Sequence, residues 1–342
     1  MTPHAGPRNA LTDIEGIRVG NAESKSARTG VTVVRFDREM RCAVDVRGGG
    51  PATRETDAVG KSGTLGIAHA ITLSGGSVFG LAAADVVAST LSSEGIGFVP
   101  VAGSPPIPIV PAASLYDLSN GGDKAWRDDP PYRLLADTAL KSASLEMSCG
   151  SVGAGFGATA GAWLGGVGSA SLDMGAEGLV SALIAVNSIG SPILPSGDCF
   201  WSWPFELGNE FGGLKPARTF EAIEPLPADR KGGLAAGTAT CVGIVASSVP
   251  LDRLSLLRLA VMAQDGLARA IRPSHAPFDG DTIFAICPDR NVEAEPEDVM
   301  RLGAAAADCV SRAVARGVWE ATAETNDAPS FGRASVSRLH SL

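Results

Sequence analysis

Short apolar runs and longer apolar segments alternate in the last hundred residues of this chain. Residues 240–247 (TCVGIVAS) and 282–287 (TIFAIC) have the length and composition of buried strands. Residues 251–271 and 296–321 predict apolar helices, the second with a proline near its first turn, where proline is tolerated. The pattern therefore predicts strand, helix, strand, helix.

The first two hundred residues combine β-prone runs, glycine turns and Ala-rich segments without a fixed repeat. Residues 31–36 and 42–46 predict the two strands of a hairpin, and Arg47-Gly-Gly-Gly50 predicts a turn that favours glycine. The run Leu73-Ser-Gly-Gly-Ser-Val-Phe-Gly80 leads into LAAADVVASTL, whose apolar spacing predicts a buried helix. This is a mixed α and β layout.

Three further segments lack a regular pattern. The proline-dense residues 100–111 exclude a regular helix or a central strand, and they lead into residues 114–118, which predict an exposed loop. Residues 190–230, rich in Gly, Pro, Trp and acidic side chains, predict a long surface excursion. Residues 231–237 (KGGLAAG) have the composition of a flexible linker, so a compact C-terminal module follows a flexible junction.

Composition narrows the class of protein. The chain has 342 residues, 45% of them hydrophobic, and its 42 glycines indicate a globular protein with close backbone packing. A net charge of -9 without a Lys or Arg cluster argues against a nucleic-acid partner. The start lacks the pattern of a signal peptide, and no run reaches the roughly 18 apolar residues of a membrane helix, so we expect a cytoplasmic protein with no membrane partner.

The cysteines give no sign of a metal site or a disulfide framework, because they lie far apart, without a CxxC pair or a nearby histidine. We expect most of them to be buried small hydrophobes, and we expect no metal and no cofactor. Cys241 follows the residue of greatest chemical interest, but a cysteine that opens an apolar strand is more often packing than chemistry. The six are Cys42, Cys149, Cys199, Cys241, Cys287 and Cys309.

The run Gly153-Ala-Gly-Phe-Gly-Ala158 fits a loose dinucleotide fingerprint, with Asp173 and Glu177 roughly 20 residues downstream. That fingerprint must follow an apolar strand, whereas MSCGSV is poor strand sequence and the run stays glycine-rich afterwards. Close packing or an active-site loop is therefore favoured over a nucleotide site.

Two carboxylates, Asp279 and Asp281, stand two residues apart just before the strand at residues 282–287. They could point towards one site, or one of them could form an Asx turn, which is the more common use of such a pair. His275 could act as a base, although a satisfied loop histidine is the more frequent case.

Thr240 opens a predicted buried strand directly after the glycine linker. A threonine hydroxyl is a poor nucleophile and needs a base nearby; the α-amine of an amino-terminal threonine, with a pKa near ~8, is such a base. That amine exists only after the chain is cut between Ala239 and Thr240, which the same hydroxyl could bring about by an N-to-O acyl shift. The setting predicts an amino-terminal nucleophile.

Several ordered motifs carry a family resemblance. They are Leu73-Ser-Gly-Gly-Ser-Val-Phe-Gly-Leu81, Tyr116-Asp-Leu-Ser, residues 153–161, Asn187 at the end of an apolar strand, Thr240, and residues 263–285 (AQDGLARAIRPSHAPFDGDTIFA). Together they closely resemble the peptidase branch of the DmpA and ornithine acetyltransferase superfamily, which includes L-aminopeptidase/D-esterases, β-peptidyl aminopeptidases and nylon-oligomer hydrolases. The resemblance covers most of the chain.

The resemblance implies an α/β fold, a four-layer αββα sandwich of the N-terminal-nucleophile hydrolase type. It also implies self-cleavage into an α chain (residues 1–239) and a β chain (residues 240–342), which form one interleaved domain and assemble into homo-oligomers. By position, Thr240 corresponds to the nucleophile, Asn187 and Tyr116 to donors for the oxyanion. Asp279 and Asp281 correspond to acidic positions that orient the nucleophile or hold the ammonium group of a substrate.

The chain departs from its relatives at two places. Relatives commonly have Asn before the nucleophile, where this chain has Ala239, and some carry a catalytic lysine where this chain has Ala162-Trp-Leu164. The favoured function is hydrolysis of a small peptide, amide or ester with a free amino end through an acyl-Thr240 intermediate. Acyl transfer to an amine and an uncleaved, non-catalytic scaffold are the alternatives.

Overall fold

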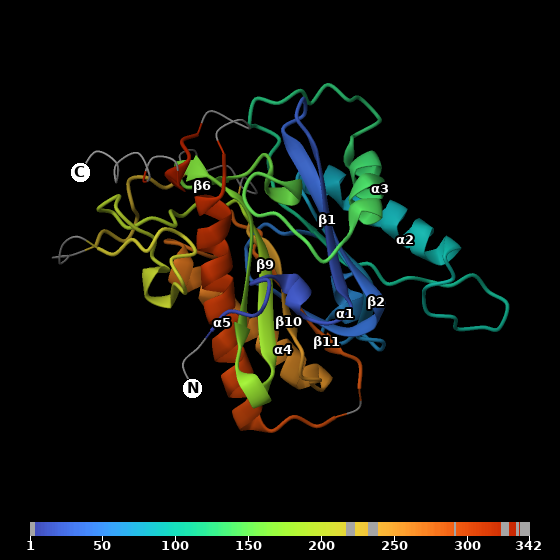
Figure 1. Cartoon of the computed structure of the whole chain (residues 1–342). Helices are drawn as coiled ribbons and strands as arrows, with labels where there is room; N and C mark the ends of the chain where they lie inside the picture. The colour runs from blue at the N-terminus through green and yellow to red at the C-terminus, as the bar shows by residue number, and fades with distance from the viewer. Residues whose placement is uncertain are drawn as a thin grey trace.

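The computed structural model describes residues 4–216, 223–231, 239–290, 292–322, 328–332 and 335. Among these residues, nine strands form one sheet in the order β3-β5-β4-β2-β11-β10-β9-β8, with β1 paired to β2 (Figure 1). The strands are β1 Ile17–Ser24, β2 Thr29–Val46, β3 Ala52–Arg54, β4 Ile67–Ser74, β5 Ala112–Ser114, β8 Gly166–Asp173, β9 Leu179–Val186, β10 Val242–Ser247 and β11 Thr282–Pro288; a separate small pair is β6 Thr159–Ala160 and β7 Trp163–Leu164. The helices are α1 Thr56–Val59, α2 Ala83–Ser93, α3 Tyr132–Ser142, α4 Arg253–Ala270 and α5 Pro296–Trp319.

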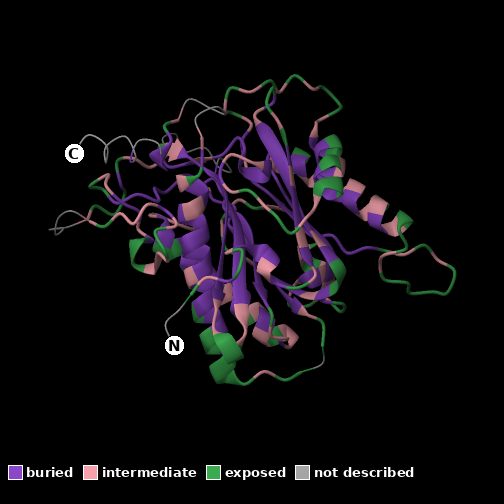
Figure 2. Ribbon diagram, in the orientation of Figure 1, coloured by how far each residue is buried: buried purple, intermediate pink, exposed green. Residues whose placement is uncertain are grey.

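Three apolar clusters separate four layers, as the predicted αββα arrangement requires. The first packs α4 and α5 against β8 to β11. The second lies between two parts of the nine-stranded sheet, with β8 to β11 on one side and β1, β4 and β5 on the other. The third packs α2 and α3 against β1, β2 and β4. Alternation along the strands produces this layering: on β11, Ile283 joins the first cluster and Phe284 the second, and on β2, Val34 joins the second and Val33 the third. Figure 2 shows the buried strands between the two pairs of helices.

The predicted hairpin over residues 31–36 and 42–46 is wrong, because both runs belong to the single 18-residue strand β2. Residues 29–36 pair with β1, and residues 40–46 pair with β11. The exposed Asp37, Arg38 and Glu39 interrupt the apolar pattern between them, at a register shift opposite β4. A polar interruption in one long strand thus has the same sequence pattern as a turn.

The predicted strand, helix, strand, helix order of the last hundred residues is confirmed. The strands β10 and β11 are parallel neighbours, with Val242 opposite Thr282, and β10 is also paired with β9. Helix α4 begins after Asp252, whose carboxylate accepts hydrogen bonds from the backbone N–H groups of Leu254 and Ser255 (2.9 and 3.1 Å). Helix α5 has Pro296 at its first turn, as predicted.

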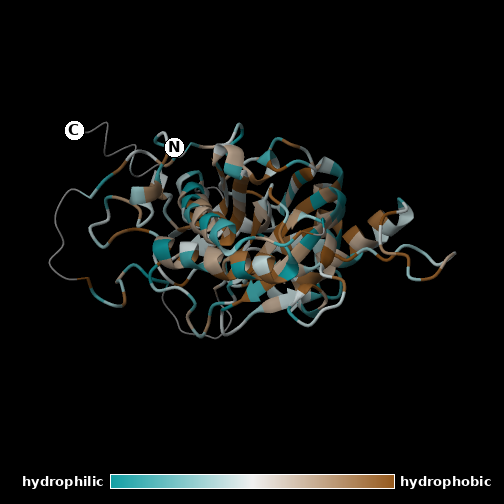
Figure 3. Cartoon of the chain, turned by 90° about the horizontal axis from the view of Figure 1, so that it is seen from below, coloured by the Kyte–Doolittle hydropathy of each residue, from teal (hydrophilic) through white to brown (hydrophobic). Residues whose placement is uncertain are grey.

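The helix predicted after Gly80 is confirmed as a 3₁₀ turn, Ser77–Ala82, followed by α2. It buries one face rather than its whole surface, with Ala83, Val87 and Leu91 towards the core. The described residues between α2 and β5 contain no helix and no central strand, in line with their prolines. This loop projects from the body of the molecule (Figure 1), and hydrophobic positions occur along it (Figure 3).

The prediction of an exposed loop at residues 114–118 is wrong. Leu115 and Asp117 are buried, and the Asp117 carboxylate accepts hydrogen bonds from the Thr29 hydroxyl (2.5 Å) and the Gly76 N–H (2.8 Å). Burial raises the pKa of Asp117 to about 6, although these bonds and Lys124 oppose the shift. Polar residues can be buried where such partners are available.

The long excursion at residues 190–230 is irregular over its described residues, as predicted, but it does not lie only on the surface. Phe200 and Phe211 are buried against the first apolar cluster, with their ring centroids 5.5 Å apart. Glu210 forms a buried ion pair with Arg312 of α5 (2.5 Å). Residues 232–237 of the predicted linker lie outside the described residues.

None of the helices in the described part of the chain is long and apolar enough to cross a membrane.

Candidate active site

Five predicted site residues meet where neighbouring strands of the sheet begin or end. We call them the strand-end cluster: Tyr116, Asn187, Thr240, Asp279 and Asp281. The sheet topology explains the meeting. Thr240 precedes β10, the carboxylates precede the parallel strand β11, and Asn187 follows the antiparallel strand β9, so all of these positions lie at the same strand ends. Tyr116 follows β5 and reaches the group through a hydrogen bond with Asn187.

Thr240 lies in the centre of this group and is almost completely buried. Its backbone N–H donates to the carbonyl oxygen of Asn187 (2.6 Å), and its hydroxyl donates to the carbonyl oxygen of Ala239. The N–H of Gly280 donates to the same Ala239 oxygen (3.1 Å). The carbonyl at the predicted cleavage site is therefore held by the predicted nucleophile and by a backbone donor.

Gly280 is required at its position by space. A Cβ atom there would lie 2.7 Å from Oγ1 of Thr240, 2.9 Å from the carbonyl oxygen of Gly50 and 3.1 Å from Cα of Pro51. Gly48 of the predicted glycine turn is close to the same loop, since its Cβ would lie 2.3 Å from the nitrogen of Asp281. These glycines let two backbone segments approach the threonine closely.

The Asn187 side chain has three hydrogen bonds within the described part of the chain. Its Oδ1 accepts from the Thr159 N–H (3.1 Å) and from Nζ of Lys231 (3.0 Å), and its Nδ2 donates to the Tyr116 carbonyl oxygen (2.8 Å). An amide nitrogen carries two hydrogens, so one N–H remains beyond these bonds. Tyr116 joins the cluster through its backbone; within the described residues its hydroxyl has no hydrogen-bond partner.

The two carboxylates differ in their surroundings. Asp281 is fully engaged: Oδ1 accepts from the Cys241 N–H (2.8 Å), and Oδ2 accepts from the N–H of His275 (3.1 Å) and lies 2.8 Å from its Nδ1. Burial lowers the pKa of His275, but the hydrogen bond and charge of Asp281 outweigh it and raise the pKa. Asp281 therefore fixes the residue after the nucleophile, and the ring of His275 is oriented by Asp281.

Asp279 has one carboxylate oxygen that makes no hydrogen bond of good geometry among the described residues. Its Oδ2 accepts from the Ala276 N–H (2.7 Å), whereas Oδ1 is buried without a hydrogen-bond partner among the described residues. Burial, followed by the negative charge of Asp281, raises the pKa of Asp279 to about 6, and the backbone N–H groups of Ala276 and Ile189, followed by the charge of Lys231, oppose this shift. Oδ1 can accept from a cationic group placed beside Thr240.

The raised pKa of Asp279 makes a prediction about stability. Because the folded pKa of about 6 lies above the ordinary 3.8, the folded chain holds this proton more tightly, and stability falls as the pH rises from about 4 to about 6. In a Thr240→Ala background, which removes the predicted nucleophile, the free energy of unfolding of Asp279→Asn relative to its parent is expected to rise by up to about 3 kcal/mol between pH 4 and pH 7. Urea unfolding at both pH values measures this, with Asp265→Asn on the exposed face of α4 as control. A difference that is the same at both pH values would contradict the assignment.

Lys231 is a site residue that the sequence did not reveal. Its backbone N–H donates to the Ile189 carbonyl oxygen (2.8 Å), and its amino group contacts Asn187. Burial lowers the pKa of Lys231 to about 8, and the negative charge of Asp279 partly offsets this effect. Its glycine-rich surroundings in the sequence indicated an exposed linker, whereas in the described structure the side chain has a buried partner in Asn187, 44 residues earlier.

Other sequence motifs have structural explanations. The Gly153-to-Ala158 run forms a buried 3₁₀ turn, Gly153–Gly155, and does not link a strand to a helix; a Cβ at Gly155 would lie 2.3 Å from the Gly166 backbone. Burial and the nearby Asp281 and Asp279 raise the pKa of Cys241, so its thiol is protonated and packs in the core. The described residues contain no cluster of three or more His, Cys, Asp or Glu side chains that could hold a metal ion.

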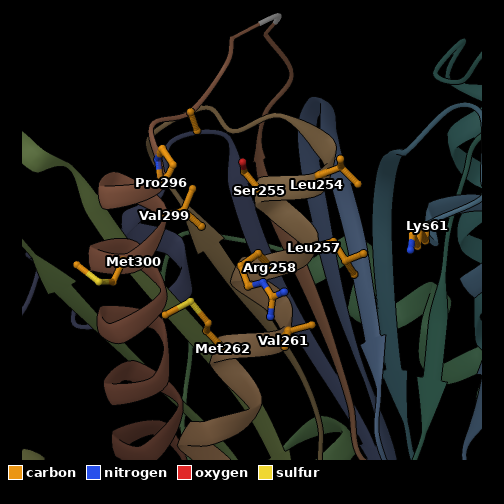
Figure 4. A pocket seen from close by; sticks show the side chains of 11 residues that line it. Lys61, Leu254, Ser255, Leu257, Arg258, Val261, Met262, Pro296, Val299 and Met300 are labelled. Carbon is orange, nitrogen blue, oxygen red and sulfur yellow. The ribbon is translucent and has the colours of Figure 1, made fainter.

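A surface groove of about 560 Å³ lies elsewhere, between α4 and α5 (Figure 4). Its walls include Leu254, Arg258 and Met262 of α4 and Val299 and Met300 of α5. None of the strand-end cluster lines it. The groove belongs to the outer helical face and not to the candidate site.

Comparison with known proteins decides the family. The model of peptidase family S58 matches residues 9–328. The chain belongs to peptidase family S58. This confirms the resemblance inferred from the ordered motifs, and it makes the protein a peptidase-class hydrolase.

Curated relatives cover most of the chain. An uncharacterized aminopeptidase from Mycobacterium bovis is 38% identical over 333 residues, which are 92% of this chain and 94% of the relative. A 6-aminohexanoate-oligomer endohydrolase from Kocuria is 29% identical over 81% of this chain and 74% of its own.

Solved structures show the fold. A β-aminopeptidase from Burkholderia has a TM-score of 0.74 at 21% identity, covering all of this chain and 96% of its own. The L-aminopeptidase D-Ala-esterase/amidase from Ochrobactrum anthropi, described as a variant of the Ntn hydrolase fold, has a TM-score of 0.68 at 18% identity, covering 99% and 96%. The predicted N-terminal-nucleophile hydrolase fold is thereby confirmed.

Proposed function

We propose that this family S58 protein is a self-processing threonine hydrolase that cuts its own chain between Ala239 and Thr240 and then hydrolyses small amides through an acyl-Thr240 intermediate. The observation that carries the proposal is the position of the Thr240 hydroxyl. It contacts the carbonyl of the bond to be cut, at the strand ends where an amide and two carboxylates meet.

The first reaction is self-cleavage. Oγ1 of Thr240 attacks the carbonyl carbon of Ala239, the C–N bond breaks, and the hydroxyl proton passes to the departing nitrogen, which leaves an ester and a free α-amine. Water then hydrolyses the ester to give the Ala239 carboxylate and a free Thr240 hydroxyl. The Gly280 N–H, 3.1 Å from the Ala239 oxygen, is the donor placed to stabilise the developing oxyanion in this step.

The second reaction is turnover. The new α-amine removes the Thr240 proton as the hydroxyl attacks the substrate carbonyl, and it passes that proton to the departing amine. Asn187 supplies its remaining amide N–H, and Tyr116 supplies its hydroxyl, as donors to the oxyanion. Water attacks the acyl-threonine ester with the same α-amine as base and restores the enzyme.

The substrates are small peptides, amides or esters with a free amino end. Asp279 supports this class, since its buried Oδ1 has no partner in the described structure and a carboxylate binds an ammonium group strongly. The names of relatives, an aminopeptidase and a 6-aminohexanoate-oligomer endohydrolase, point to the same kind of acyl group. Burial of Thr240, Asn187 and Asp279 supports a latent state before cleavage.

The acyl intermediate provides the test. The purified protein is mixed with a panel of aminoacyl p-nitroanilides and esters and quenched during turnover, and the 240–342 fragment is weighed by mass spectrometry. We expect a mass increase equal to the acyl group, located on Thr240. An adduct on another residue would reject the nucleophile, and product that forms only when an acceptor amine is added would indicate acyl transfer.

We further propose that the cleaved αβ units form a homo-oligomer. The loop between α2 and β5 supports this, because Phe98, Val99, Val101 and Ile107 are all exposed there, and exposed apolar groups mark association surfaces. Light scattering is expected to give a multiple of the mass of one 34.8 kDa chain, and Val99→Asp with Val101→Asp is expected to lower it. A monomeric wild type would contradict this assembly.

A further inference from the structure

The amino group of Lys231 is buried beside the strand-end cluster, and the mechanism above does not use it. It lies at hydrogen-bond distance from Oδ1 of Asn187 (3.0 Å). The backbone of Lys231 is held separately by its N–H bond to Ile189 (2.8 Å), so the side chain is not needed to anchor this segment. An apolar side chain could fill the same space without the cost of burying an amine, which favours a role for the amine itself.

The amine determines which way the Asn187 amide points. Lys231 and the Thr159 N–H both donate to Oδ1 of Asn187. If the amide were turned by a half rotation, its NH₂ group would face these two donors and neither hydrogen bond could form. The observed orientation instead directs Nδ2 towards the Tyr116 carbonyl and leaves one N–H without a partner among the residues that the structure describes. A cationic donor at Oδ1 also polarises the amide, which strengthens its N–H as a donor.

We propose that Lys231 is a positioning residue for the hydrolytic reaction, whose ammonium group orients and polarises Asn187 so that its remaining N–H can stabilise the oxyanion formed at Thr240. This inference rests on the proposed function. It assigns a lysine to the site from residues just before the cleavage junction, and not from the segment around Ala162-Trp-Leu164 where some relatives carry one.

The charge of Lys231 gives the proposal a pH dependence. Burial lowers the pKa of this lysine to about 8, and the negative charge of Asp279 before β11 opposes the shift; the Cys241 thiol before β10 also faces the amine but is protonated and uncharged. The ammonium form is present below this pKa and is lost above it, so oxyanion stabilisation weakens as the pH rises through about 8. The Thr240 α-amine acts in the opposite sense, because it must be neutral to serve as base. Wild-type activity should therefore rise and then fall with pH.

The experiment compares Lys231→Met, Lys231→Arg and the exposed control Lys25→Met. Self-cleavage is followed by intact mass, folding by circular dichroism, and kcat and KM are measured from pH 6 to pH 10 with a p-nitroanilide that the wild type cleaves. We expect Lys231→Met to lower kcat about 30-fold, less than the roughly 10²- to 10³-fold loss on removal of a direct donor, with KM changed less than about threefold. Lys231→Arg should keep much of the activity and lose the fall at high pH, because a guanidinium stays charged.

Two results would overturn the proposal. One is a kcat for folded Lys231→Met within about threefold of wild type. The other is a fall of kcat at high pH that is the same in Lys231→Arg as in the wild type. The second result decides the question if the methionine variant does not fold. Failure of the proposed function gives a different result, because the wild type and Lys25→Met are then also inactive. In that case the positioning role of Lys231 fails together with the proposed function.

Discussion

Replacing Thr240 with alanine is expected to leave one chain of 34.8 kDa and to abolish amide hydrolysis, a loss of about 10⁴-fold or more. In the proposed mechanism both reactions use the same hydroxyl, first on the Ala239 carbonyl that it contacts and then on the substrate. Thr240→Ser keeps a hydroxyl and should retain part of both reactions. Intact mass and p-nitroanilide turnover measure the two effects on the same sample.

Thr72 offers a matched control for this substitution. It is a buried strand threonine whose hydroxyl has no hydrogen-bond partner among the described residues, and it lies in β4. Thr72→Ala should therefore be cut and active like the wild type. A Thr240→Ala chain that is still divided at residue 240 would show that another group performs the cleavage.

Placing a methyl group at residue 280 is expected to slow self-cleavage by about 10²-fold or more. The Cβ of Gly280→Ala would lie 2.7 Å from Oγ1 of Thr240, so the hydroxyl or the loop must move. Moving the loop also displaces the Gly280 N–H from the Ala239 oxygen, and loss of an oxyanion donor costs roughly 10²- to 10³-fold. The rate is read from the fraction of uncut chain against time after purification.

Gly60, which directly follows α1, provides a control for the general cost of a crowded methyl group. The Cβ of Gly60→Ala would lie 2.8 Å from the carbonyl oxygen of Thr56. This substitution should lower the free energy of unfolding without slowing cleavage selectively. Equal cleavage rates for Gly280→Ala and wild type would mean that the Thr240 hydroxyl does not react from its present position.

The arrangement of the strand-end cluster could be predicted largely from sequence, because strand ends are marked by where apolar runs begin and stop. Thr240 precedes one run, Asp279 and Asp281 precede another, and Asn187 ends a third. Pairing those runs as neighbours brings the residues together without any knowledge of side-chain contacts. The different surroundings of the two carboxylates could not be predicted in this way, since they depend on hydrogen bonds to Cys241 and Ala276.

Predictions were wrong where burial depends on distant partners. Asp117 is buried because Thr29 and Gly76 donate to it, and both are far away in the sequence. Lys231 is half-buried and its amino group contacts Asn187, although glycines follow it in the sequence. Local polarity indicates exposure only when no such partner exists elsewhere in the chain.

The central claim is that Thr240 becomes an amino terminus, and intact-mass analysis with amino-terminal sequencing of freshly purified protein tests it most directly. We expect two fragments, residues 1–239 and 240–342, the smaller beginning TCVGIVA, and an uncut chain for Thr240→Ala. The opposite result is a wild-type preparation that remains a single 34.8 kDa chain, together with a Thr240→Ala variant that hydrolyses amides as fast as the wild type; this would contradict the claim.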